Sequence, residues 1–398
     1  MTIQAKIKVA MKILDIFDNL IRYIKPNKKI RINKIKKILI IKSDKLGDAV
    51  NSIFIISSIK KSLPDKEIHI LASDKNSFIF NELYKEHVIR KKYIFKNSNI
   101  LNLNVNKNFP IGYIKYLKLL FSKNYFELIK KIKKEKYDLV IDLVGKRHLA
   151  ILSKLISKRT IGPKISGFTW LYDYGFDRSW TYESKKHIIE NWKDLIDEAL
   201  GIKLNIENVK IPIKRIKSDI HKNYILFHIG GTDIRRFENE KIINIINRTS
   251  LLSKIFIIDD VGQRHIKEIE NEIKNRNVTF IKINYSLPQL AWLAKNSKLF
   301  ITFDGGHMHY LSMFTKTLVF WSCGVLEAWM PWDGSKYSLI KKYPNKTMVF
   351  KSKNKGHRVL VYPTIYRPCF DIGCKNRECL KNIKLEQIME NIKEMISE

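Results

Sequence analysis

The stretch KILIIKSDKLGDAVNSIFIISSIKKSLPDKEIHILA, residues 37–72, decides the fold class. It opens with Lys37–Lys42, a short apolar run typical of a buried strand. A turn containing Gly47 follows, and then a helical pattern runs from Asp48 to about Ser62 and is closed by Pro64. A second strand is predicted at Ile68–Ala72. The order strand, turn, helix, strand predicts a βαβ unit in a parallel sheet.

The same alternation continues along the chain and restarts after a polar, lysine-rich linker at residues 204–223. Further strands are predicted at Asp138–Val144, Tyr224–His228, Ile255–Asp259, Thr279–Ile283, Leu299–Phe303 and Thr317–Trp321. We therefore predict an α/β protein with two Rossmann-like, doubly wound domains, residues 37–205 and 222–382, facing a central cleft. A basic amphipathic helix at residues 1–36 precedes them, and an amphipathic helix at residues 383–398 follows.

Positive charge dominates the chain, with 74 Lys and Arg residues against 39 Asp and Glu residues and a formal net charge of +35. Such a surface attracts nucleic acids, anionic lipid head groups or phosphorylated substrates, but lysine spread over a whole chain also arises from compositional bias. Residues 1–37 stand out, because six apolar residues recur there at helical spacing: Val9, Ile13, Ile16, Phe17, Leu20 and Ile24. This segment is predicted either to contact an anionic membrane surface or to pack on the domain that follows.

The sequence argues against several classes of protein. No apolar run approaches the ~18 residues that span a bilayer, and the N-terminal residues lack the pattern of a secretory signal. Zinc-finger, RRM and KH patterns are missing, so we expect no nucleic-acid partner. Cys369, Cys374 and Cys379 are spaced by five, whereas zinc sites favour closer pairs. We interpret them as reduced thiols in a cytoplasmic protein, the alternative being a metal site completed by His357.

The first candidate site is Lys42–Asp48, which follows a strand and opens a helix. Gly47 permits a close backbone approach. Asp48 at the start of the helix has two interpretations: a helix cap that favours the positive end of the dipole, or a general base that takes a proton from an incoming hydroxyl group.

The second candidate site is His228–Phe237, again directly after a strand. Its Gly230–Gly231 pair frees the backbone, and Thr232 offers a hydroxyl group. Arg235 and Arg236 present forked donors that suit a diphosphate. The alternative is a glycine turn with exposed arginines.

The third candidate site is Phe303–His309, which leads from a strand into a helix. Gly305 and Gly306 expose backbone N–H groups that bind anions, and Asp304 is placed to orient the loop or to contact a sugar hydroxyl. A metal held by Asp304, His307 and His309 is the weaker alternative, because their spacing matches no known zinc class. Together, the sites predict a base in the first domain and a diphosphate site in the second, an arrangement that suits group transfer from a nucleotide-diphosphate donor.

From about residue 37 to residue 395, the chain resembles the heptosyltransferase family, glycosyltransferase family 9, which builds the inner core of lipopolysaccharide. The matching pieces in chain order are Lys37–Asp48 (opening strand and Gly-Asp turn), Tyr137–Gly145 (Y-D-L-V-I-D-L), Arg159–Gly162 (R-x-x-G), His228–Phe237 (H-x-G-x-x-x-x-K-x-W), Leu287–Asn296 (helix before the donor loop), Phe303–His309 (N-D-[ST]-G-x-x-H) and Phe320–Pro331 (strand and W-x-P turn).

The resemblance implies a GT-B fold and an inverting glycosyltransferase that moves a sugar, heptose from ADP-heptose, onto a phosphorylated glycolipid at the inner face of the inner membrane. It implies no tightly bound cofactor or catalytic metal. The residues that it assigns are Asp48 as base, Lys45 and Gly47 for the acceptor, and Thr232, Arg235, Asp304, Gly305, Gly306 and His309 for the donor.

Three positions depart from the family pattern: Arg235 replaces Lys, Phe237 replaces Trp, and Gly305 replaces Ser or Thr. The departures leave open a related GT-B transferase that uses another nucleotide-sugar or a protein or capsule acceptor. A nucleic-acid-binding protein is the more distant alternative, prompted by the charge.

Overall fold

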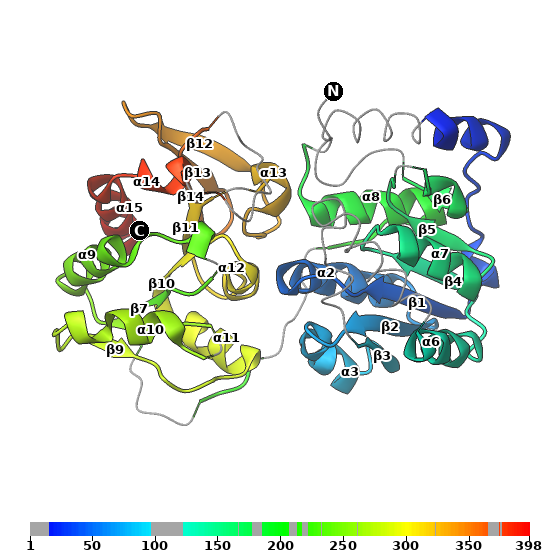
Figure 1. Cartoon of the computed structure of the whole chain (residues 1–398), viewed down its shortest axis with the longest axis horizontal. Helices are drawn as coiled ribbons and strands as arrows, with labels where there is room; N and C mark the ends of the chain where they lie inside the picture. The colour runs from blue at the N-terminus through cyan, green and yellow to red at the C-terminus, as the bar shows by residue number, and fades with distance from the viewer. Residues whose placement is uncertain are drawn as a thin grey trace. The chain divides into compact units, whose positions relative to one another are not determined.

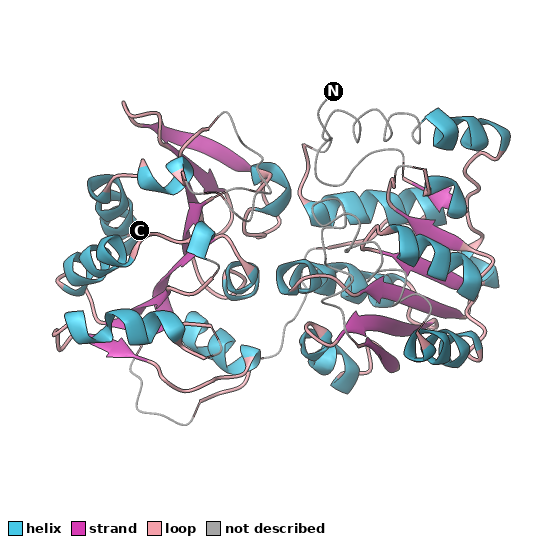
Figure 2. Cartoon of the chain, in the orientation of Figure 1, coloured by secondary structure: helices cyan, strands magenta, loops and turns pink. Residues whose placement is uncertain are grey.

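The computed structural model describes residues 16–96, 122–165, 167–176, 185–206, 213–216, 222–231, 233–260, 262–322, 324–364, 374 and 376–398. The chain divides into two compact units, Met1–Lys210 and Ile211–Glu398 (Figure 1). Each is a sheet with helices on its two faces, as the colouring by secondary structure makes plain (Figure 2). The predicted α/β class with two Rossmann-like units is confirmed.

The first unit contains a parallel sheet of six strands in the order β3-β2-β1-β4-β5-β6. Its elements are η1 (Ile32–Lys34), β1 (Lys37–Lys42), α2 (Leu46–Ser62), β2 (Glu67–Ser73), η2 (Ser77–Phe80), α3 (Asn81–Lys85), β3 (Lys91–Phe95), α6 (Lys123–Lys133), β4 (Leu139–Asp142), α7 (Arg147–Ile156), β5 (Thr160–Gly162), η3 (Thr169–Leu171), β6 (Tyr174–Gly175) and α8 (Ile188–Leu200).

Strand β1 is buried on both faces because helices cover each side of the sheet. Its residues Leu39 and Ile41 join a core with α6 and α7, and Ile38 and Ile40, which alternate with them, are equally buried and point the other way. This two-sided burial explains why the strand is a continuous apolar run rather than an alternating pattern.

The second unit contains eight strands in the order β12-β13-β14-β11-β10-β7-β8-β9, parallel except for the β12–β13–β14 edge. Its elements are β7 (Tyr224–His228), η4 (Asp233–Arg235), α9 (Asn239–Ser250), β8 (Ile255–Ile258), α10 (Arg264–Ile269), η5 (Glu270–Glu272), β9 (Val278–Phe280), α11 (Leu287–Asn296), β10 (Ser297–Phe303), α12 (Gly306–Leu311), β11 (Thr317–Trp321), α13 (Leu326–Trp329), β12 (Tyr337–Lys342), β13 (Met348–Ser352), β14 (Arg358–Val361), α14 (Glu378–Lys381) and α15 (Leu385–Ser397).

The C-terminal helix α15 belongs to the core of this second unit, where Ile388, Met389 and Ile392 pack with α9. Three predicted strands, β1, β7 and β11, have the predicted ends. The β12–β13 hairpin was not predicted, because β12 lies at the sheet edge and much of it is exposed. An edge strand of this kind lacks the continuous apolar run that marks the buried strands.

The described part of the basic N-terminal segment, residues 16–24, is helical and attaches to the first unit through its polar side. Asp18 accepts a hydrogen bond from the backbone N–H of Trp170 at 2.9 Å, and Arg22 donates to the carbonyl of Thr169 at 2.8 Å. The apolar residues of the helix face away, with Tyr23 88% exposed and Ile24 77% exposed. The described part of the apolar stripe, Ile16, Phe17, Leu20 and Ile24, is therefore exposed rather than packed on this unit, and Val9 and Ile13 lie outside the described residues. Among the described residues, no helix is both long and apolar enough to cross a bilayer.

Candidate active site

In the first unit, a buried ion pair lies at the carboxyl end of β1. Lys42 is fully buried, and its ammonium group donates to Asp44 Oδ2 at 2.8 Å and to the carbonyl of Leu143 at 3.1 Å. The same group lies 4.2 Å from the ring centroid of Trp192. These contacts offset the several kcal/mol that taking a charge out of water costs. Lys42 thus holds the loop that leads into α2.

Asp48 lies in the first turn of α2, beside this ion pair. The N-cap residue of the helix is Lys45, so the interpretation of Asp48 as the cap is wrong. Burial, and then the neighbouring carboxylate of Asp44, raise the pKa of Asp48 to about 7, although Lys42 opposes the shift. A carboxyl group that titrates near neutrality is suited to accept a proton. Lys45 and Gly47, predicted to contact the acceptor, belong to the same turn.

A second buried carboxylate, Asp142, ends β4 and holds the next loop. Its Oδ1 accepts hydrogen bonds from the backbone N–H groups of Val144 at 2.8 Å and Gly145 at 3.1 Å, and its Oδ2 accepts the hydroxyl of Tyr172 at 2.6 Å. A Cβ on Gly162 would come within 2.2 Å of the Tyr172 ring. Asp142 is the second Asp of the Y-D-L-V-I-D-L motif, and Gly162 is the Gly of the R-x-x-G motif. Both residues pack against Tyr172, which explains why the two motifs occur together.

In the second unit, the glycine pair after β7 is required by the backbone. Gly231 has a φ of +123°, which side chains rarely adopt. A Cβ on Gly230 would lie 2.8 Å from the backbone nitrogen of Asp260. The Gly231 N–H donates to Asp260 Oδ2 at 2.7 Å, so the turn is fixed to the end of β8.

Three of the predicted donor residues come together at the carboxyl edge of this sheet. Arg235 Nη1 lies 3.5 Å from Asp304 Oδ2, which also accepts a hydrogen bond from the Ser322 hydroxyl at 3.4 Å. Burial, and then the charge of Arg235, lower the pKa of His309 to about 3, so this ring is neutral at physiological pH. His309 also meets the ring of Trp329 at a centroid distance of 6.1 Å.

The loop before α12 does not require glycine at position 305. Gly305 has an extended backbone, and a Cβ there would meet nothing within 4 Å. Neither strain nor crowding therefore demands glycine at this position. Gly306 is the first residue of α12, which ends at Leu311, and so short a helix offers free N–H groups rather than a large dipole.

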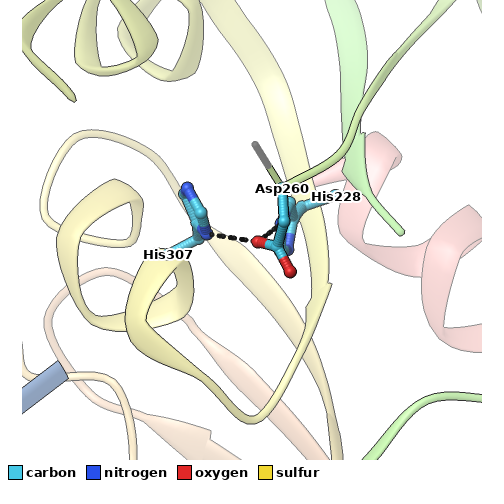
Figure 3. Close-up of side chains that lie close together, drawn as sticks. All are labelled: His228, Asp260 and His307. Atoms are coloured by element: carbon cyan, nitrogen blue, oxygen red, sulfur yellow. Dashed lines mark hydrogen bonds and ion pairs between the residues drawn. The ribbon is translucent and has the colours of Figure 1, made fainter. Parts of the chain in front are cut away.

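Beside this loop lies a cluster that the sequence interpretation missed, formed by His228, Asp260 and His307 (Figure 3). Asp260 Oδ1 is 3.2 Å from His228 Nε2 and 3.3 Å from His307 Nδ1. Burial alone would raise the pKa of Asp260, but hydrogen bonds with the two rings outweigh it and hold the pKa well below its usual range. The available signal was the Asp259–Asp260 pair at the end of a predicted strand, together with His228 and His307 in the second and third candidate sites.

Other predicted residues fall elsewhere. Thr232 and Cys369 lie outside the described residues. Cys374 and Cys379 form no disulfide, and Nδ1 of the buried His357 accepts a hydrogen bond from the backbone N–H of Thr317 at 3.1 Å. Within the described ranges, the group with metal-ligand geometry is His228, Asp260 and His307, not the predicted Asp304, His307 and His309.

Comparisons with known proteins agree with this arrangement of sheets and loops. No family model matches the chain. Lipopolysaccharide heptosyltransferase 1 of Campylobacter coli is 25% identical over 316 residues, covering 69% of this chain and 80% of the relative.

Solved structures share the fold across almost the whole chain. A family 9 glycosyltransferase of Veillonella parvula superposes with a TM-score of 0.65 at 14% identity, covering 93% of this chain and 99% of its own. E. coli heptosyltransferase II superposes with a TM-score of 0.59 at 12% identity, covering 91% of this chain and 98% of its own. E. coli heptosyltransferase WaaC, solved with ADP-2-deoxy-2-fluoro heptose, superposes with a TM-score of 0.56 at 13% identity, covering 90% of this chain and 99% of its own.

The chain therefore shares with these enzymes the GT-B fold, in which two Rossmann-like units carry loops at the carboxyl edges of their sheets. The sequence relative is a lipopolysaccharide heptosyltransferase, which agrees with the family that the motifs of this chain resemble.

Proposed function

We propose that this protein transfers a heptose from ADP-heptose to an inner-core lipopolysaccharide acceptor, with inversion at the anomeric carbon. The observation that carries the reaction type is Asp48, a carboxyl group at the carboxyl end of β1 whose pKa is raised to about 7. The similarity to lipopolysaccharide heptosyltransferase 1 and to the ADP-heptose enzyme supports the donor and acceptor class.

The donor is assigned to the second unit. Arg235 is 31% exposed at its side chain and pairs with Asp304 at 3.5 Å, longer than a hydrogen bond. A diphosphate, with two negative groups, competes well for such a guanidinium because Arg binds phosphate oxygens in a forked geometry. The N–H groups at Gly305 and Gly306 supply further donors, and neutral His309 adds no charge of its own.

The acceptor is assigned to the first unit. Its hydroxyl oxygen attacks the anomeric carbon on the face opposite the diphosphate, and its proton passes to the Asp48 carboxylate. The bond between the anomeric carbon and the diphosphate oxygen breaks, and ADP leaves with the electron pair while Arg235 neutralises the developing charge. The exposed Lys45 lies in the turn of Asp48, where it would attract a phosphorylated acceptor.

A membrane-bound acceptor also accounts for the N-terminal helix. Ile16, Phe17, Leu20, Tyr23 and Ile24 are exposed on a segment rich in lysine and arginine. An apolar face flanked by positive charge binds the surface of an anionic bilayer, so we propose that residues 1–37 hold the enzyme at the inner face of the membrane beside its glycolipid acceptor.

The donor assignment is tested by thermal unfolding with a panel of nucleotide-sugars. A ligand at 100 times its Kd adds about 2.7 kcal/mol to the stability of the folded state. We expect ADP-heptose to raise Tm more than ADP-glucose, UDP-glucose or dTDP-glucose, and Arg235→Met to reduce the shift. A larger shift in Tm with a UDP- or dTDP-sugar would identify a related transferase with another donor. Strong binding of DNA without any effect of sugar-nucleotides on Tm would reject the proposal that the protein is a glycosyltransferase.

A further inference from the structure

The His228–Asp260–His307 cluster has no role in the transfer reaction derived above. The three residues come from three segments that the fold brings to one edge: the end of β7, the residues after β8 and the first turn of α12 (Figure 3). Their facing ligand atoms lie within 4.8 Å of one another. From this geometry we infer that the cluster is a binding site for a divalent metal ion of the zinc class.

The distances match a tetrahedral site. With metal–ligand bonds of about 2.0–2.1 Å, neighbouring ligand atoms in a tetrahedron are about 3.3–3.4 Å apart. The two separations to Asp260 Oδ1 are 3.2 Å and 3.3 Å. The third edge, between the two histidines, is no longer than 4.8 Å, and a bound ion would draw the partly exposed His307 ring inward. Three protein ligands leave the fourth position open for water.

Hydrogen bonds behind the cluster orient the ligands in the way that metal sites require. His228 Nδ1 lies 3.3 Å from Thr302 Oγ1, whose own hydroxyl donates to the carbonyl of Phe303 at 3.2 Å. In the tautomer whose Nδ1–H donates to Thr302, Nε2 carries the lone pair that a metal ion requires, and it is directed at Asp260 Oδ1. A bound metal ion would replace the proton that these two atoms share in its absence. The other oxygen of Asp260 is held by the N–H of Gly231.

The donor set also selects the ion. Two imidazoles and one carboxylate suit Zn²⁺, Co²⁺ and Fe²⁺, whereas Mg²⁺ and Ca²⁺ prefer oxygen ligands throughout. The metal would lie beside the Gly230–Gly231 turn and would join the ends of two strands, β7 and β8, to the first turn of the helix α12. It is independent of the proposed reaction, because its binding is measured without any sugar-nucleotide.

The test is a titration of the full chain, first stripped of metal with a chelator, with Co²⁺ as a visible probe. We expect uptake of Co²⁺ with a nitrogen–oxygen ligand spectrum that lacks the thiolate charge-transfer bands of cysteine ligands. Zn²⁺ displaces the probe and excess Mg²⁺ does not. His307→Ala and Asp260→Asn should weaken binding by more than ~100-fold, because even the loss of an outer-shell partner costs 10- to 100-fold. Circular dichroism checks that each variant is folded.

Two further variants separate ligation from general damage. Thr302→Val, which removes the acceptor for His228 Nδ1, should weaken Co²⁺ binding by ~10- to 100-fold, and Thr302→Ser should restore it. His87→Asn is the control, since this exposed histidine has a φ of 57° that Asn tolerates, and binding should be unchanged. No Co²⁺ uptake, uptake with thiolate bands alone, or uptake indifferent to His307→Ala would show that the cluster is only hydrogen-bonded and would overturn the inference.

Discussion

Replacing Asp48 by Asn should make the protein more stable at alkaline pH while removing its activity. The pKa of Asp48 is raised from 3.8 to about 7 in the folded state. Between these two values the folded chain holds a proton that the unfolded chain releases, so stability falls as pH rises from about 4 to about 7 and is then level. At 1.36 kcal/mol for each pKa unit, the full penalty is at most about 4 kcal/mol.

Asp48→Asn avoids this penalty because Asn has no proton to lose and nearly the same shape. We expect the variant to exceed the wild type in free energy of unfolding by up to about 4 kcal/mol at pH 8.5, with the difference shrinking towards zero near pH 4. The assay is urea unfolding at a series of pH values, with hydrogen exchange of amides in β1 and β4 reporting on the first unit.

Activity should change in the opposite direction. Loss of a general base lowers the rate by ~10²-fold or more, and in the wild type kcat/KM should rise as pH increases through about 7, where Asp48 becomes ionised. An Asp48→Asn protein that is no more stable than the wild type at pH 8.5, or whose advantage is the same at pH 4, would refute the assigned burial of this charge. Near-normal turnover of the variant would refute the assignment of Asp48 as base.

Asp44→Ala leaves the buried ammonium of Lys42 without its carboxylate and should lower the free energy of unfolding by about 3–5 kcal/mol. Adding Lys42→Met should recover most of this loss. If urea unfolding shows no recovery in the double variant, the ion-pair explanation is contradicted. Gly231→Ala, at a φ of +123°, should destabilise the second unit by more than about 1 kcal/mol. Gly305→Ser lies in extended backbone with open space, so it should alter the free energy of unfolding by only a few tenths of a kcal/mol. Its added hydroxyl should strengthen donor binding measured by calorimetry. Equal losses of stability in Gly231→Ala and Gly305→Ser would contradict the backbone conformations described for the two glycines. Arg235→Lys should retain part of the affinity for ADP, and Arg235→Met should lose about 1.5–3 kcal/mol of binding free energy. Titration calorimetry at two salt concentrations measures both affinities, and equal affinities of the two variants would reject this order.

Much of the fold was predictable because the buried parallel strands carry their own signal. β1, β7 and β11 are covered on both faces, so their apolar runs are continuous and were located from sequence at or near their true ends. The exposed β12–β13 hairpin has no such constraint on its residues and was missed. The helix at residues 16–24 was predicted from its periodicity, but the sequence did not show that its polar side is the attached one.

The candidate site likewise has a part that the sequence predicted and a part that it did not. Glycine turns between a strand and a helix placed Gly230, Gly231 and Gly306 at the sheet edge from sequence alone, because in a parallel sheet every strand ends at the same edge. Sequence order says nothing about which strand ends are neighbours. Strand β8 pairs with β7, and β7 with β10, and this pairing brings Asp260 to His228 and His307.

By itself, the sequence determined the class of the fold, the two-unit organisation, and the loops that carry the reactive side chains. Only the tertiary structure decided that Lys42 pairs with Asp44 beneath Trp192, that Asp48 titrates near neutrality, and that two histidines converge on one oxygen of Asp260. The physical reason is that periodicity records which residues are buried, whereas a shifted pKa or a ligand geometry depends on which side chains meet and how deeply they are buried, and both depend on segments such as those of Trp192 and His307 that lie far along the chain.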